Sequence, residues 1–167
     1  MSIAQSLLPE YDHEMATTRK HLERAPFADW AWKPHEKSMT LGALASHLAE
    51  IPSWVAGTMM GTEWDVAPKD GPAYAVPTFG SVAELLAFFD QQVKEGRAAL
   101  AAAKDADFAV SWALKAGGET LFAMPRLGVI RTWVLNHTCH HRGQFTVYLR
   151  LRGVPLPQTY GPSADEQ

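Results

Sequence analysis

The chain has 167 residues, of which 47% are hydrophobic and 20% are charged, and its formal net charge is -3 at pH 7. These values favour a single domain spanning residues 1–167 with a sizeable hydrophobic core. The negative charge gives no reason to expect a nucleic-acid partner. No uncharged apolar run approaches the roughly 20 residues of a membrane span, so no membrane partner is expected either.

Cys139 is the only cysteine, which excludes an intrachain disulfide and favours a reducing compartment. The N-terminus leads directly into an amphipathic segment that carries Glu10, Asp12 and Glu14, which does not resemble a secretory signal. We therefore expect a cytoplasmic protein.

Two helices are predicted before the first long connection. Apolar residues recur at steps of three and four over residues 6–24, which indicates an amphipathic helix. A second helix is predicted over residues 40–60, with Thr40 as its N-cap. Pro52 lies inside this pattern and lacks a backbone donor, so we expect a kink one turn earlier, near Leu48.

Residues 61–80 are rich in proline and glycine and predict a long ordered loop. Such a loop is a candidate lid or pocket wall, which Trp64, Tyr74 and Phe79 would hold in place. A third helix is predicted over residues 81–104, because it opens on the capping-box pattern Ser81-Val82-Ala83-Glu84.

A small β-hairpin and a last helix complete the predicted fold. Residues 111–114 and 120–123 flank Gly117-Gly118, which is typical of a hairpin turn. The fourth helix is predicted from Pro125 to about Arg152, before an extended surface tail. The expected class is all-α: a four-helix bundle with long connections and a small hairpin between the third and fourth helices.

The fourth helix carries three of the seven histidines within five residues. On a helical wheel with His137 at zero, His141 lies at about 40°, which places it at the centre of the predicted apolar face. His140 lies on the flank, at about -60°, and Arg142 is expected to point away. Two inward imidazoles one turn apart form half of a divalent metal site.

A third ligand is needed, and His47 in the second helix is the best candidate. It lies in the apolar stripe beside Leu44 and Ile51, where a lone histidine is more often a core residue than a ligand. The need for a ligand on a facing helix decides in its favour. The remaining histidines are expected at the surface, namely His13, His21 and His35.

Two further residues are candidates for supporting or proton-handling roles. Glu50 lies one turn after His47, where it could be an additional ligand or, preferably, a partner of a ligand. Tyr148 lies on the same face as His141, where core packing is the simpler role. Cys139 falls near 200° on the wheel, so it is predicted to be neither ligand nor nucleophile. The flank with Gly143 and Val147 could contact another helix or form a dimer interface.

Three segments resemble the DinB/YfiT-like superfamily of metal-dependent four-helix proteins. The segment Leu44-Ala45-Ser46-His47-Leu48-Ala49-Glu50 resembles the histidine segment of its second helix, and residues 136–150 resemble its fourth-helix motif. The ending Gly153-Val154-Pro155-Leu156-Pro157, followed by Tyr160-Gly161, also fits. The similarity extends over essentially the whole chain.

The resemblance implies a bundle in which His47, His137 and His141 hold a divalent ion, with water or substrate completing the coordination. It also implies a homodimer, as in many relatives. Zinc and nickel are the ions expected first, although histidine nitrogen also suits iron and copper.

Some members of the superfamily are mycothiol- or bacillithiol-dependent enzymes, in which the metal activates the thiol of the cofactor. The expected function is therefore a metal-dependent enzyme acting on a small molecule, with a low-molecular-weight thiol, in an S-transferase-like reaction. A metal-dependent hydrolase and a non-catalytic metal- or ligand-binding stress protein are the alternatives.

Overall fold

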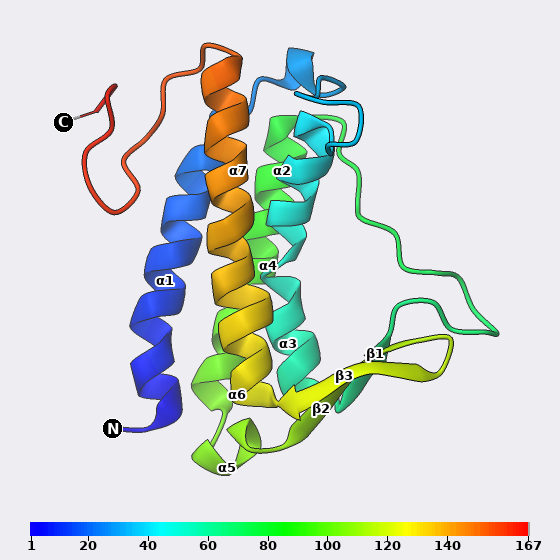
Figure 1. The fold of residues 1–167 in the computed structure, drawn as a ribbon. Coiled ribbons are helices and arrows are strands. Elements are labelled where there is room, and N and C mark those ends of the chain that lie inside the picture. The colour runs from blue at the N-terminus through cyan, green and yellow to red at the C-terminus, as the bar shows by residue number, and fades with distance from the viewer. Residues whose placement is uncertain (167) are drawn as a thin grey trace.

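The computed structural model describes residues 1–166 and is mainly helical, with a small sheet at one end of the helices (Figure 1). Four helical segments lie side by side. They are α1 (Ile3–Leu22), α2 (Leu41–Glu50) with α3 (Ser53–Met60), α4 (Val82–Ala102), and α6 (Arg126–Val129) with η2 (Ile130–Asn136) and α7 (His137–Leu151). Both α1 and α2 contact α4 and α7, so the apolar stripes meet in one shared core.

The short helices lie in the connections: the 3-10 helix η1 (Phe27–Asp29) follows α1, and α5 (Asp105–Phe108) follows α4. Within residues 1–166, no helix combines the length and the apolar character that crossing a membrane would need.

The sheet contains one strand more than the predicted hairpin. Strands β2 (Ser111–Ala116) and β3 (Glu119–Pro125) are antiparallel, and β1 (Glu63–Asp65) pairs in parallel with β2. Gly117 and Gly118 have φ of 61° and 84°, as the two central residues of a type I′ turn require. The hairpin prediction is confirmed, but the class is mainly helical with a three-stranded sheet, not all-α. The strand β1 was missed because it has only three residues within a segment rich in proline and glycine.

The predicted N-caps of the second and third helices are confirmed, whereas α1 begins at Ile3, before the predicted start near Ser6. The Thr40 hydroxyl accepts a hydrogen bond from the Ala43 amide at 3.1 Å, and the Ser81 hydroxyl accepts one from the Glu84 amide at 3.1 Å. The Glu84 carboxylate does not complete the box on Ser81, because it accepts from the amide of Gly80 instead. Around Pro52 the helix breaks between α2 and α3, slightly later than the predicted kink at Leu48.

The sequence predicts one continuous α-helix for the fourth segment, but the structure divides it into three parts. Pro125 ends β3, and residues 130–136 form the π-helix η2 between α6 and α7. A π-helix makes hydrogen bonds one residue further along the chain, so each turn holds more residues. The face before η2 is therefore rotated relative to the face after it, which a single wheel cannot represent.

The buried face of α7 differs from the core face that the sequence predicts for the fourth segment. With His137 at zero and about 100° per residue, the buried residues Thr138, Phe145 and Leu149 cluster near 100°. Thus His141 is not at the centre of the buried face, and both His137 and His141 are half-buried on its flank. Arg142, expected to point away, is instead 2% exposed.

The C-terminal segment is extended, as predicted, and it folds back over α1 and α7 (Figure 1). The Tyr160 hydroxyl lies within hydrogen-bond distance of both Glu14 carboxylate oxygens and accepts a hydrogen bond from Arg142 at 2.6 Å.

His21 is also covered by the C-terminal segment and is fully buried, so the prediction that it lies at the surface is wrong. Its Nδ1 donates to the Thr17 carbonyl at 2.8 Å, and its Nε2 accepts from the hydroxyl of Thr159, a residue of the tail.

Candidate metal centre and adjoining cavity

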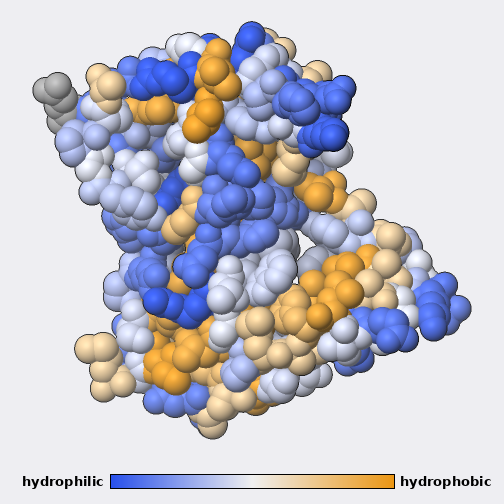
Figure 2. All heavy atoms as spheres, viewed as in Figure 1, coloured by the Kyte–Doolittle hydropathy of each residue, from blue (hydrophilic) through white to orange (hydrophobic). Residues whose placement is uncertain are grey.

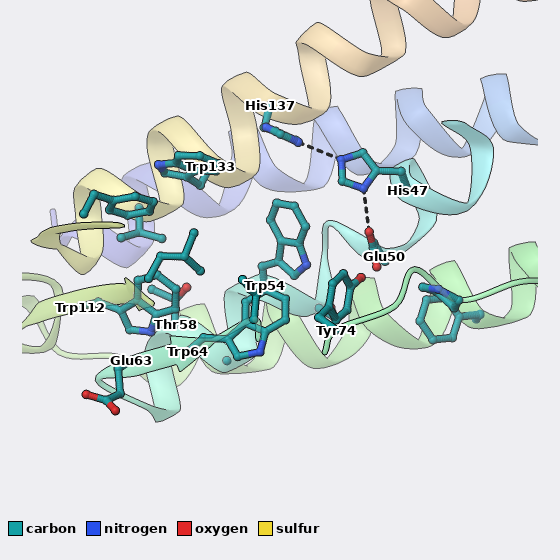
Figure 3. Close-up of a pocket in the computed structure, with 18 residues that line it drawn as sticks. His47, Glu50, Trp54, Thr58, Glu63, Trp64, Tyr74, Trp112, Trp133 and His137 are labelled. Carbon is teal, nitrogen blue, oxygen red and sulfur yellow. Dashed lines mark hydrogen bonds and ion pairs between the residues drawn. The ribbon is translucent and has the colours of Figure 1, made fainter. Parts of the chain in front are cut away.

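Three histidines from two helical segments meet at the inner side of the bundle. One ring nitrogen each from His47, His137 and His141 lies within 4.8 Å of the other two. The Nε2 atoms of His47 and His137 are 3.0 Å apart and point toward one another (Figure 3). The spacing of His137 and His141, four residues apart in α7, places their ring centroids 4.4 Å apart. This cluster could hold a metal ion.

Glu50 fixes the tautomer of His47. The two residues are one turn apart in α2, and His47 Nδ1 donates to Glu50 Oε1 at 2.7 Å. Glu50 is 2% exposed, so its carboxylate is held in place with this imidazole as its hydrogen-bond partner. With the proton on Nδ1, the lone pair of Nε2 faces the cluster, as ligation of a metal requires. The prediction placed Glu50 in this role in preference to direct ligation.

Gln144 has the same role for His141, and the sequence reasoning did not single it out. His141 Nδ1 donates to Gln144 Oε1 at 2.7 Å, which again leaves Nε2 with a free lone pair. The signal was present in the sequence, because Gln144 follows His141 by the same three residues that separate Glu50 from His47. The Nε2 atoms of His47 and His137, 3.0 Å apart, form a hydrogen bond when His137 carries its proton on Nε2. With that proton on Nδ1, both lone pairs would be available to a cation.

Burial favours the neutral form of His137 and His141. Partial burial, together with the neighbouring rings of His141 and His47, lowers the pKa of His137 from 6.5 to about 4. Burial also lowers the pKa of His141, against the opposing effect of its hydrogen bond to Gln144. At neutral pH each of these two rings is therefore neutral, with one nitrogen protonated and the other carrying a free lone pair.

The other candidate residues lie outside the cluster. The ring of exposed His140 approaches His141, with centroids 4.9 Å apart, but His140 is not one of the three clustered histidines. The Tyr148 hydroxyl donates to the carbonyl of Met39, and its ring packs edge-on against Trp32, so the packing role weighed for Tyr148 is the one observed. His13 and His35 are exposed, as predicted.

Cys139 lies on the opposite side of α7 from the histidine cluster. Its sulfur contacts the Glu14 carboxylate at 3.4 Å and the Tyr160 hydroxyl at 3.1 Å, on the side that faces α1 and the C-terminal segment. Burial raises the pKa of this thiol, which disfavours the reactive thiolate. Both observations agree with the prediction that Cys139 is neither ligand nor nucleophile.

A cavity of about 690 Å³ opens beside His47 and His137, and seven of its lining residues are tryptophan, tyrosine or phenylalanine. This volume lies within the range of small-molecule sites. Trp64 and Tyr74 both line it, which confirms that residues 61–80 provide a pocket wall. The Asp65 carboxylate tethers this wall to the hairpin by accepting backbone hydrogen bonds from Gly117 and Gly118. Hydrophobic residues also gather on the outer surface of the part formed by β1, β2 and β3, which projects beside the helices (Figure 2).

A comparison with protein-family models shows which family the chain belongs to. The family model of the DinB superfamily matches residues 10–145. The chain belongs to the DinB superfamily. The matched range includes α2 and most of α7, and therefore contains all three clustered histidines and both of their hydrogen-bond partners.

Solved structures of DinB-like proteins share the fold. A DinB-like protein from Bacillus cereus has 24% sequence identity and a TM-score of 0.71, over 95% of this chain and 98% of that chain. A DinB-like protein from Bacillus subtilis has 16% identity and a TM-score of 0.67, over 97% and 99% of the two chains. No curated protein matches at a significant level. At these identities, the two DinB-like structures establish a shared fold alone.

Proposed function

We propose that this DinB superfamily member binds a divalent metal ion through His47, His137 and His141 and uses it in an enzymatic reaction on a small molecule. The observation that carries the proposal is the convergence of three imidazole nitrogens within 4.8 Å beside a cavity of about 690 Å³. A set of three histidine ligands leaves a coordination position free, as in catalytic zinc sites. Zinc and nickel are the ions to test first.

The preferred reaction is a thiol-dependent S-transfer. A bound divalent ion would lower the pKa of a thiol and so favour the thiolate near neutral pH. The chain itself would hold the ligand rings through Glu50 and Gln144, and it would place an electrophile in the adjoining cavity. The thiol sulfur would displace the leaving group of that electrophile, and the thiol proton would pass to solvent.

Hydrolysis is the second candidate, and the position of Glu50 favours it. This carboxylate lines the cavity as well as bonding to His47, so it could accept a proton from a water molecule beside the ion. Turnover of esters without added thiol, lost in Glu50→Gln even when zinc saturates the site of the variant, would support hydrolysis over S-transfer.

The metal site is tested by elemental analysis after reconstitution with zinc or nickel. We expect one ion per chain in the wild type, and a loss of bound ion in His47→Ala, His137→Ala and His141→Ala. His140→Ala is the matched control, because His140 neighbours the cluster without belonging to it. Loss of the ion in His140→Ala but not in His141→Ala would mean that the wrong neighbour has been assigned.

The reaction is tested by turnover of a model electrophile with several low-molecular-weight thiols, with and without added metal. Metal-dependent formation of a thioether supports the S-transferase proposal. Tight ligand binding without turnover of any thiol or ester would favour a non-catalytic binding protein. Cys139→Ser is the internal control and should retain full activity.

We also propose that the protein is a homodimer, as expected from the superfamily resemblance. The flank of α7 offers a surface for it, because Gly143 is exposed and Val147 is 56% exposed. Light scattering after size-exclusion chromatography measures the mass, and Val147→Glu should shift it toward the monomer. A monomeric wild type would contradict this part of the proposal.

A further inference from the structure

Two connected sets of aromatic rings line the cavity. In the first, the Phe122 and Trp133 rings stack with centroids 4.8 Å apart and planes 13° from parallel. Trp133 in turn stacks on His137, at 5.9 Å and 25°. This series of rings runs from the hairpin across η2 to the histidine cluster, and Figure 3 shows Trp133 and His137 on one side of the pocket.

The second set comes from other elements and leads to the same histidines. The Trp54 ring meets His47 edge-on at 5.6 Å and lies 6.3 Å from Trp64. Trp64 meets Tyr74 edge-on at 4.9 Å. Thus α3, β1 and the following loop each contribute one ring. A ligand between the two sets would contact ring faces and edges, which favours a flat aromatic partner.

In the metal-free protein, the cavity wall offers no free charge to a charged partner. None of the described residues that line the cavity is a lysine or an arginine, so away from the histidine cluster an anion would find no counter-charge on the wall. Both carboxylates of the wall already have partners: Glu50 bonds to His47, and Glu63 pairs with Lys115 at 2.6 Å. An organic cation would thus lack a free carboxylate, and burying an unpaired charge is unfavourable.

We infer that the cavity binds an uncharged aromatic molecule, with its reactive group directed toward the histidine cluster. This names the substrate class of the proposed enzyme, and the catalytic part of the inference rests on that proposed function. Binding of the aromatic body needs no metal, because the rings that surround it come from the chain alone.

The test is calorimetric titration of the metal-free protein with a matched series of probes. Naphthylmethanol is the uncharged aromatic probe, naphthoate and naphthylmethylammonium carry opposite charges on the same ring system, and the fully hydrogenated analogue of naphthylmethanol lacks aromaticity. We expect naphthylmethanol to bind once per chain, with a Kd at least about tenfold lower than that of either charged probe. It should also bind several-fold more tightly than the hydrogenated analogue.

Variants locate the binding. Trp133→Leu should weaken naphthylmethanol binding by about tenfold or more. Trp30→Leu is the matched control, because Trp30 is also half-buried but lies outside the cavity, and it should leave the Kd unchanged. Trp64→Leu provides a second cavity variant from a different element, should Trp133→Leu fail to fold.

Three results would overturn the inference: tighter binding of naphthoate, tighter binding of naphthylmethylammonium, or wild-type affinity in both folded cavity variants. The naphthylmethylammonium result would identify a cation-binding aromatic cage instead. Failure of the metal or turnover experiments, with intact naphthylmethanol binding, would count against the proposed enzyme alone. Metal binding and turnover without a preference for uncharged aromatic probes would count against this inference alone.

Discussion

Glu50 and Gln144 each fix the ring of a clustered histidine three residues earlier, at the same hydrogen-bond length of 2.7 Å. Residues in such positions orient a ligand and raise its basicity. We predict that Glu50→Gln and Gln144→Leu each weaken zinc affinity by about 10- to 100-fold. Competition with a chromophoric chelator measures the change.

Glu95→Gln is the control for this pair of variants, because Glu95 accepts from Gln91 on the exposed side of α4, away from the cluster. The zinc affinity of Glu95→Gln should equal that of the wild type. If both Glu50→Gln and Gln144→Leu kept the wild-type zinc affinity, this would contradict the supporting role of Glu50 and Gln144.

His21 predicts a pH dependence of stability that is independent of the metal site. Burial lowers its pKa below the usual 6.5, although the hydrogen bond to the Thr17 carbonyl opposes the effect. Below pH 6.5 the unfolded chain therefore binds more protons at this residue than the folded chain does. The free energy of unfolding should fall as the pH falls from 6.5 toward the lower folded-state pKa.

Urea unfolding of the metal-free protein at a series of pH values measures this effect. His21→Gln removes the titrating group and keeps one hydrogen-bonding amide, so its stability should depend less on pH over the same interval. The difference between the two proteins isolates His21, because His137 and His141 contribute equally to both. An equal slope in the two proteins would show that burial of His21 has no such consequence.

At the scale of the element, the π-helix η2 marks the limit of what sequence periodicity could predict. Apolar spacing and capping residues were sufficient for the helical segments and the hairpin, because these signals are local. The three candidate ligands could be predicted for the same reason, because the spacing of His137 and His141 and the apolar stripe around His47 are local patterns too. The burial of Arg142 depends on its ion pair with Glu14 of α1 and its hydrogen bond to Tyr160 of the tail, and the burial of His21 depends on the same tail. These partners are distant in sequence, so no local pattern predicts them.

Helix α4 packs closely against α1 and against the break between α2 and α3, and this close packing requires a glycine at position 96. A Cβ there would lie 2.6 Å from the Tyr11 hydroxyl and 2.9 Å from the Pro52 carbonyl oxygen. We predict that Gly96→Ala lowers the free energy of unfolding by about 1–3 kcal/mol, since the helices must move apart. Thermal and urea unfolding measure the loss.

Gly57→Ala is the matched control, because a Cβ at this position in α3 would meet no atom within 4 Å. Replacing an unhindered helical glycine by alanine should raise the free energy of unfolding by about 0.5–1 kcal/mol. The two substitutions should thus have opposite signs, and an equal effect would mean that the close approach at Gly96 is not limiting.

At the scale of the whole molecule, a metal ion in the cluster would connect α2 to α7 across the bundle. An ion that binds only the folded chain stabilises it, and zinc at 100 times its Kd should add about 2.7 kcal/mol to the free energy of unfolding. Thermal unfolding with and without zinc measures the increment. It should vanish in His47→Ala and persist in His140→Ala, and an increment that survives in His47→Ala would place the ion elsewhere.

The ligands of the cluster are distant in sequence, since His47 and His137 are separated by 90 positions. Closing so long a loop has an entropic cost that the two histidines of α7 do not incur between themselves. A nascent chain that has produced α2, the sheet and α4 still lacks two of the three donors. An ion held by all three histidines would therefore be acquired only after the last helix has been synthesised and has docked. Such an ion would not template the early steps of folding, and its binding would report on completed assembly of the bundle.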